Sequence, residues 1–224
     1  MKVLSVDTST HICRAGIFDS ENGIIAELSV NLTFKNQKRH TEYLIHLIDT
    51  ILDKSLLSLE EIDIFALVVG PGSYTGLRAG VSTIKGLAFA LDKPIVPINT
   101  LEALGWNFPY SSVPICATIG AKKNEIHYGF YRCVGQDIID TGVKGLYKIE
   151  NFHEIIREKT IIVGDAVLLY LDIVKENISD YGIFPRHNLH YISISTVSTF
   201  AISIFKRYGF IDGALVVPRY SLVI

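Results

Sequence analysis

The sequence predicts a mixed α/β protein with two lobes, and three observations lead to this prediction. Three apolar, strand-like runs open the chain, and helical and strand-like segments then alternate. Residues 106–114, WNFPYSSVP, interrupt this order with two prolines and two serines, as a break between lobes would. After the break, three further strand-like runs begin the order again. We therefore expect one lobe at residues 1–106 and a second at residues 107–224.

Composition places the chain among ordinary globular proteins. Its 224 residues can bury a substantial core, and 49% hydrophobic with 20% charged residues argues against disorder. The formal net charge of −2 excludes a strong overall attraction to nucleic acid or anionic lipid. Lys35, Lys38 and Arg39 form the best local basic group, and its plainest interpretation is a solvated loop.

The cysteines and the N-terminal residues indicate the cellular compartment in which we expect the protein. Cys13, Cys116 and Cys133 form no closely spaced pair, which argues against a disulfide framework and suits a reducing environment. Cys13 lies in an apolar run, so we interpret it as a core residue and not as a nucleophile. The chain shows neither a signal-peptide pattern nor an apolar run of membrane-spanning length. A cytoplasmic protein is expected.

Hydrophobic periodicity predicts the elements of the first half. Short, apolar, β-branched runs predict strands at 2–9, 12–19, 24–32, 62–70 and 93–99. Helical spacing predicts helices at 40–55, 73–91 and 100–107. In the first of these helices the residues of one apolar stripe are Leu44, Leu47, Ile48, Ile51 and Leu52. Three hairpin-connected strands followed by alternating helices and strands are typical of the ribonuclease-H-like half of actin-like and sugar-kinase-like proteins.

The second half repeats part of this order. Strand-like runs occupy 114–120, 125–133 and 136–149. Residues 160–175 read as a strand that enters a helix, and 195–209 as a helix with a Ser or Thr cap and a Gly stop. Two related lobes are therefore expected, although no sequence repeat is visible.

The most informative segment is VVGPGSYTGLRAG at residues 68–80, where a strand-like run enters a glycine-rich turn before a helix. This context suits a phosphate-binding turn. However, the segment lies outside the first βα unit and lacks the Gly-Lys-Ser/Thr of a Walker loop. Pro71 also removes one backbone donor. Phosphate binding at this turn is the less favoured interpretation.

The favoured interpretation of the same glycines concerns packing. Gly72, Gly76 and Gly80 recur every four residues, so they share one face once the helix has begun. A glycine inside a helix costs about 1 kcal/mol relative to alanine, and close approach of another helix can offset that cost. Leu77 and Val81 belong to a bulky second side that can cover the sheet. We predict a helix–helix contact along the small side, including one between chains.

Other candidate sites are less complete. The turn VDTST offers Asp7, Thr8 and Ser9 as weak candidates for nucleotide contacts, but it lacks a glycine that would let phosphate reach the backbone. His40 and His46 are six positions apart and would point about 240° apart on a helix, which does not suit a metal pair. No metal site and no catalytic set is predicted.

Four segments carry a resemblance to a known family. VLSVDTST at the start, KRHTEYL opening the first long helix, and above all VVGPGSYTGLRAGVSTIKGLAFAL resemble the TsaB (YeaZ) family of bacterial threonylcarbamoyladenosine synthesis. IGAKKNEIHYGFY is similar to the family's second-lobe signature, with Gly120 and Lys122 in place of its Asp and Arg. The ending PRYSLVI departs from the family's Pro-x-Tyr-Leu-Arg. The resemblance covers the whole chain and implies a two-lobed actin-like ATPase (ASKHA) fold with two ribonuclease-H-like lobes.

The resemblance also implies a function. The chain would be a non-catalytic subunit that supports TsaD, its paralogue, in transferring a threonylcarbamoyl group to a tRNA adenosine next to the anticodon. TsaE would be a further partner, the chain alone would form a homodimer, and tRNA would be met only through the complex. ATP or ADP is a candidate ligand at the complex interface, and none is expected on this chain alone.

Together, the resemblance and the glycine pattern place the partner interface on the first two long helices. The predicted interface residues are Leu44, Ile48, Ile51, Gly72, Gly76, Gly80 and Val81. A Gly80→Leu substitution is then expected to abolish the complex and leave the monomer folded. Lys35, Lys38 and Arg39 are weak candidates for tRNA contacts.

Two alternative functions remain open from the sequence alone. The first is an actin-fold kinase or ATPase that uses Asp7 and its turn, which predicts nucleotide affinity sensitive to Asp7→Ala. The second, less favoured, is a peptidase, in line with an older label of the family. Neither has a complete catalytic set in the sequence.

Overall fold

The computed structural model describes residues 1–33, 40–135, 137–178, 180–210 and 212–220. They fall into two units. Unit 1 consists of Met1–Asn99 together with Ser193–Tyr220, and unit 2 contains Thr100–Ile192. Lys35, Lys38 and Arg39, the predicted tRNA contacts, lie outside the described residues.

Unit 1 is built on a five-stranded mixed sheet in the order β3-β2-β1-β4-β5. Its strands are β1 (Lys2–Asp7), β2 (Ile12–Asp19), β3 (Gly23–Asn31), β4 (Ile64–Gly70) and β5 (Ile95–Asn99). The first three are antiparallel neighbours, whereas β4 runs parallel to β1 and β5 parallel to β4. Every residue of β4 is buried, as expected for a continuous apolar run covered on both faces.

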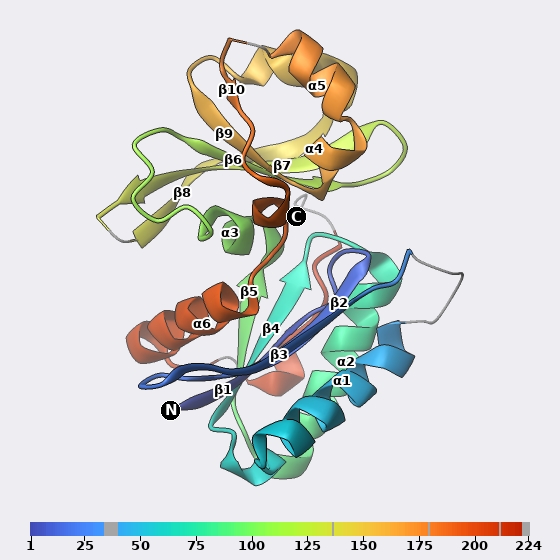
Figure 1. Ribbon diagram of the computed structural model, residues 1–224, viewed down its shortest axis with the longest axis vertical. Helices are drawn as coiled ribbons and strands as arrows, with labels where there is room; N and C mark the ends of the chain where they lie inside the picture. Colours follow the sequence, from blue (N-terminus) through green and yellow to red (C-terminus); the bar gives the residue numbers. More distant parts are fainter. Residues whose placement is uncertain (34–39, 136, 179, 211, 221–224) are drawn as a thin grey trace. The chain divides into compact units, whose positions relative to one another are not determined.

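Helices cover both faces of this sheet (Figure 1). Helices α1 (His40–Ser55) and α2 (Tyr74–Leu91) lie on one face, and α6 (Ile194–Tyr208) lies on the other. Two short 3₁₀ helices, η1 (Leu59–Glu61) and η4 (Gly213–Leu215), complete the unit. The main apolar core lies between the sheet and α1 with α2.

Helix α6 corrects the sequence-based boundary, which assigned all of 107–224 to the second lobe. Its buried residues Ile194, Val197 and Ala201 pack on strands of unit 1, so the unit is closed by residues far along the chain. The Ser5 and Ser198 hydroxyls lie 2.7 Å apart, and a Cβ on Gly16 would come within 2.6 Å of Ile194 Cγ2. An apolar helix stripe shows that a sheet must cover it, but not which sheet.

Unit 2 has the same strand arrangement, in the order β10-β9-β6-β7-β8. Its strands are β6 (Ile115–Gly120), β7 (Glu125–Val134), β8 (Asp137–Lys148), β9 (Thr160–Gly164) and β10 (Gly182–Ile183). Its helices are α3 (Thr100–Gly105), α4 (Asp165–Leu169), α5 (Leu171–Asn177), and the 3₁₀ helices η2 (Ile149–Ile155) and η3 (His187–His190). Three antiparallel strands followed by parallel additions occur in both units, so the expected pair of ribonuclease-H-like lobes is confirmed.

The interpretation of Cys13 as a core residue is confirmed. Cys13 and Cys116 are free thiols buried in the two cores, whereas Cys133 is partly exposed. Burial, with a smaller contribution from the Asp7 carboxylate and a small opposing one from Arg14, raises the pKa of the Cys13 thiol to about 12. Burial also raises the pKa of Cys116.

These environments predict selective thiol chemistry. At pH 8 a maleimide or disulfide reagent is expected to modify Cys133 and to leave Cys13 and Cys116 unmodified, because thiolate and access are both required. All three should react in denaturant. Mass spectrometry of the native, labelled chain measures this, and modification of Cys13 at the rate of Cys133 would contradict the burial described here.

Candidate protein-interaction surface

The apolar stripe of α1 faces the chain's own sheet. Leu44 and Ile51 are 0% and 1% exposed and belong to the core of unit 1, together with Val81 of α2. These three predicted interface residues are therefore not available to a partner, which corrects the sequence-based assignment. The physical reason is that the sheet already covers the apolar stripe of the helix, so the stripe cannot also contact a partner.

The glycine-rich segment also packs against residues of the same chain. The turn after β4 lies against the turn after β1: the Ser73 amide donates to Ser9 O at 2.7 Å. Ser73 then caps α2, because its Oγ accepts from the Gly76 amide at 3.2 Å. Helix α2 thus begins directly on the turn that follows the first strand.

Close approach of these two turns explains Gly72 and Gly80. A Cβ on Gly72, whose φ is +155°, would stand 2.1 Å from Ser9 O, and one on Gly80 would stand 2.4 Å from Thr8 Oγ1. Gly76 is also buried in α2. The predicted helix–helix contact along Gly72, Gly76 and Gly80 is corrected accordingly: Gly72 and Gly80 are small because a turn of the same unit packs on them.

In the turn that was a weak candidate for nucleotide contacts, Asp7 is hydrogen-bonded to groups of the same unit. Asp7 is buried; its Oδ1 accepts from the Ser9 amide at 2.9 Å and the Ser9 hydroxyl at 2.6 Å. Its Oδ2 accepts from Arg14 at 3.4 Å. Thr8 and Ser9 are buried too, and Thr8 Oγ1 faces Gly80 without a hydrogen-bond partner. The Asp7 carboxylate is thus already engaged by groups of the same unit.

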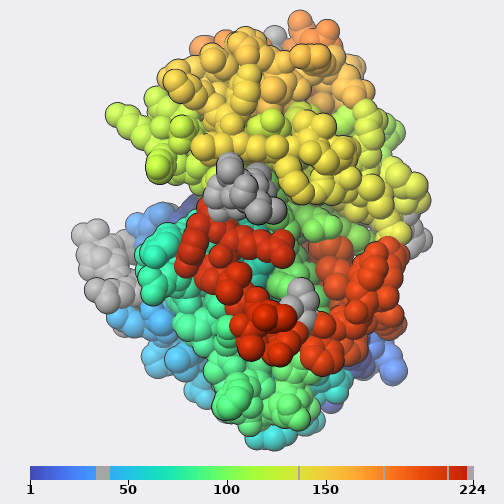
Figure 2. Space-filling model, turned by 180° about the vertical axis from the view of Figure 1, so that it is seen from behind, coloured from blue at the N-terminus to red at the C-terminus, as the bar shows by residue number. Residues whose placement is uncertain are grey.

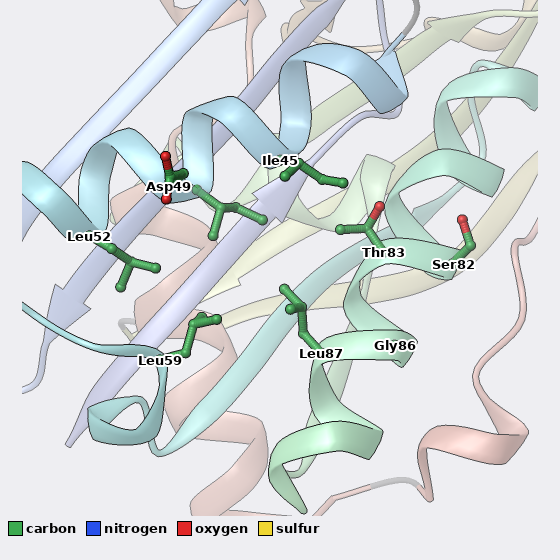
Figure 3. Close-up of a pocket in the computed structure, with 9 residues that line it drawn as sticks. Ile45, Asp49, Leu52, Leu59, Ser82, Thr83, Gly86 and Leu87 are labelled. Atoms are coloured by element: carbon green, nitrogen blue, oxygen red, sulfur yellow. The ribbon is translucent and has the colours of Figure 1, made fainter.

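An apolar groove lies between α1 and α2 instead (Figure 3). Its volume is about 370 Å³, and it is lined by Ile45, Ile48, Asp49, Leu52, Leu59, Ser82, Thr83, Gly86 and Leu87. Figure 3 shows side chains of both helices directed into the space between them, with Ile45 and Leu52 from α1 and Leu87 from α2. Ile48, a predicted interface residue, forms part of this lining although it is 4% exposed.

The groove is open to a partner. Ile45 is 58% exposed, and a Cβ added to Gly86 would meet no atom within 4 Å. Sequence reasoning did not select these residues, although Ile45 widens the apolar surface of its helix beyond the stripe and Gly86 continues the small side chains of α2. Those two deviations from a simple stripe were the available signal.

Charged groups border the groove unevenly. The exposed side of α1 carries Glu42 and Asp49, and Asp49 lines the groove itself, whereas the exposed Asp53 is paired with Lys54 at 3.0 Å. The exposed side of α2 carries Arg78, which donates to the Tyr74 hydroxyl at 3.0 Å and lies over its ring. A ligand of this surface would therefore bring apolar side chains and a basic group for Asp49.

Gly120 and Lys122, at which the chain departs from the family's second-lobe signature, both lie in unit 2. The Gly120 amide donates to Asp165 Oδ1 at 2.9 Å, and a Cβ on Gly120 would be in ordinary contact with Leu169. Lys122 is an exposed residue between β6 and β7. In the described part of the chain, no group of three or more His, Cys, Asp or Glu side chains is placed to hold a metal ion. No described helix has both the length and the apolar character of a bilayer span.

Solved structures with the same fold define the class. YeaZ from Pseudomonas aeruginosa superposes with a TM-score of 0.81 over 98% of this chain and 99% of its own, at 20% identity. The activator of 2-hydroxyisocaproyl-CoA dehydratase from Clostridium difficile, solved with bound ADPNP, gives a TM-score of 0.51 over 95% of this chain and 100% of its own, at 10% identity. The chain is thus a two-lobed protein of the actin-like ATPase fold.

Sequence comparison narrows the class to a family. The family described as "TsaD: tRNA N6-adenosine threonylcarbamoyltransferase" matches residues 32–170. The tRNA threonylcarbamoyladenosine biosynthesis protein TsaB of Haemophilus influenzae is 34% identical over 131 residues, which are 57% of this chain and 52% of that relative. The chain belongs to the family so described, and it is similar in sequence to several TsaB proteins. The match spans about half the length of the Haemophilus relative.

Proposed function

We propose that this chain is a non-catalytic partner of a TsaD threonylcarbamoyltransferase, which it supports in transferring the threonylcarbamoyl group to a tRNA adenosine next to the anticodon. The open apolar groove between α1 and α2 carries this proposal. A surface groove lined by Ile45, Leu52 and Leu87 exposes apolar area whose burial by a partner is favourable. The relationship to the TsaD family supports a paralogue as that partner.

The turn after β1 supports the non-catalytic part of the proposal. In an actin-fold enzyme that used Asp7, its carboxylate would have to face a nucleotide or its metal ion. Here both carboxylate oxygens are engaged by Ser9 and Arg14 of the same unit. Releasing this carboxylate for catalysis would leave the buried Arg14 without this partner, which is energetically costly.

Further parts of the proposal concern the assembly. We propose that TsaE joins the complex and that ATP or ADP binds where subunits meet. The chain alone would self-associate through the same groove, since the groove would otherwise stay exposed. With a net charge of −2 the chain does not attract tRNA strongly, so tRNA would be met through the complex, in the cytoplasm.

Size-exclusion chromatography with light scattering tests the proposal, on the chain alone and mixed with its cognate TsaD. The expected result is a dimer alone that exchanges into a mixed complex. A monomer that ignores TsaD would overturn the proposal. In that case nucleotide binding by the isolated chain becomes the next measurement, because the enzyme interpretation predicts it.

The groove itself makes a sharper prediction. Gly86→Leu is expected to weaken TsaD binding by at least about 100-fold, because the new side chain occupies the groove. Its fold should be unchanged, since the position is open and glycine is a poor helix former. Isothermal titration calorimetry measures the affinity, and circular dichroism the fold.

The matched control is Thr199→Leu, an exposed site on α6 that also gains a leucine. Helix α6 lies on the other face of the sheet, so this variant should bind TsaD like the wild type (Figure 1). Equal affinity of Gly86→Leu and the wild type would show that the groove is not the docking site.

A further inference from the structure

The segment 212–220 lies on unit 1 along α2. Figure 2 shows it in red on the surface, beside the turquoise and green residues of that helix. It begins with a local turn in which Asp212 Oδ1 accepts from the Ala214 amide at 2.9 Å. Val216 then points inward: it is 3% exposed and belongs to the core shared by the sheet, α1 and α2. The segment is therefore a packed part of unit 1.

One side chain of α2 holds the middle of this segment. The Lys85 ammonium donates to Ala214 O and to Val216 O, both at 3.1 Å. These two carbonyls belong to the residues before and after Leu215, and the second of them is that of the buried Val216. Hydrogen bonds from a charged donor are stronger than those between neutral groups. Lys85 thus joins α2 to residues about 130 positions away in the chain.

The end of the segment is fixed at the start of α2. The Arg219 amide donates to Val69 O at 2.7 Å, at the end of β4. A Cβ on Gly70 would stand 2.1 Å from Arg219 O, so only glycine allows this approach. The Tyr220 ring then packs on the Tyr74 ring, with centroids 4.5 Å apart. The segment consequently contacts α2 at Tyr74 and at Lys85, three helical turns apart.

The segment and the groove lie on different sides of α2. Thr83 and Leu87 line the groove, and each is two positions from Lys85. Two helix positions correspond to a rotation of about 200°, so Thr83 and Leu87 lie nearly opposite Lys85, whereas Ser82 and Gly86, which also line the groove, lie about 60° and about 100° from it. The helix is held on one side by α1 and the sheet, and on the other by residues 212–220.

We infer that residues 212–220 are a strap that fixes the position of α2, one of the two helices that form the groove. Lys85 holds the strap on α2 through its two hydrogen bonds. This inference rests on the proposed function, because the surface that the strap positions is the groove between α1 and α2. Partner affinity then depends on a segment that lies outside the groove. Lys85 is a positioning residue, since it acts through α2 and the strap.

The test is Lys85→Met in the full chain, which keeps an unbranched apolar stem and removes the donor. Hydrogen exchange is read by mass spectrometry at the amides of 212–220, and TsaD affinity by calorimetry. The matched control is Lys93→Met, because Lys93 also donates its ammonium to a backbone carbonyl of unit 1, Glu60 O at 3.1 Å, but does not hold the strap. Lys85→Arg keeps a cation that can donate to two carbonyls.

The expected result is at least about tenfold faster exchange of the strap amides in Lys85→Met, with β1 amides unchanged. TsaD affinity should fall about five- to tenfold, and Lys85→Arg should restore most of both quantities. Lys93→Met should behave like the wild type.

Two outcomes would overturn the inference. Wild-type exchange of the strap in Lys85→Met would show that Lys85 does not fasten it. Faster exchange with wild-type TsaD affinity would show that the strap does not set the docking surface, while the proposed function stands. If the wild-type chain itself fails to bind TsaD, the proposed function is overturned and the affinity part of this inference with it, whereas the exchange data still decide the fastening.

Discussion

Gly80→Leu is expected to lower the free energy of unfolding by about 3 kcal/mol or more, because leucine does not fit between α2 and the turn after β1. Even a Cβ would stand 2.4 Å from the buried Thr8 Oγ1 and 3.4 Å from Leu67. This result would replace the sequence-based expectation that the variant loses its partner and keeps its fold. Urea unfolding followed by circular dichroism measures it.

Gly86→Ala is the control in the same helix. No atom lies within 4 Å of the added Cβ, so alanine should raise the stability by about 0.5–1 kcal/mol through helix propensity alone. The two substitutions should therefore shift the urea midpoint in opposite directions. A Gly80→Leu variant that unfolds at the wild-type midpoint would contradict the packing of the two turns.

Asp7→Ala is expected to destabilise the chain by about 3–5 kcal/mol, the range seen when one partner of a buried ion pair is removed. The Ser9 amide and hydroxyl lose their acceptor, and the buried Arg14 loses its carboxylate partner. Thermal and urea unfolding measure the loss. The effect should be on stability alone, with no change in nucleotide affinity between variant and wild type.

Asp63→Ala provides the comparison for this variant. Asp63 also accepts a backbone amide, that of Lys2 at 2.7 Å, but it is exposed, so its loss should cost about 1 kcal/mol or less. An Asp7→Ala chain that remains as stable as Asp63→Ala and loses ATP binding would favour the enzyme interpretation.

Local sequence patterns predicted the elements well because each pattern has a single physical cause. The apolar runs at 2–9 and 62–70 became buried strands, since such runs are stable only when both faces of a sheet are covered. The helical spacing of residues 73–91 likewise predicted where α2 begins and ends. A mixed sheet with helices packed on it followed for the first lobe, because few topologies connect such elements, whereas the order of the strands within each sheet comes from the structure.

The interface assignment from sequence included residues that the chain buries itself, because one pattern can have two causes. Leu44 and Ile51 have the spacing of a contact stripe, but the chain's own sheet provides the contact. Gly80 has the spacing of a helix–helix contact, but Thr8 of a distant turn provides it. Sequence spacing shows that a residue must be packed or must be small, and only the fold shows what packs on it.

The groove was not predicted because it belongs to neither helix alone. Ile45 and Leu87 come from segments more than forty positions apart and line one hollow only after both helices pack on the sheet. The strap was missed for a similar reason. Nothing in the sequence around Val216 indicates that it fills the core of the first lobe.

The discontinuity of unit 1 has a consequence for biosynthesis. A ribosome makes residues 1–99 first, yet α6 and the strap that complete this lobe come at 193–220. Until then the sheet lacks the cover on one face, and the core lacks Val216. All described residues of unit 2 lie between 100 and 192, so they are synthesised before the residues that complete unit 1. We therefore expect the second lobe to fold before the first is complete, so that ribosome-stalled chains ending near residue 192 hold a protease-resistant second lobe and a protease-sensitive first one.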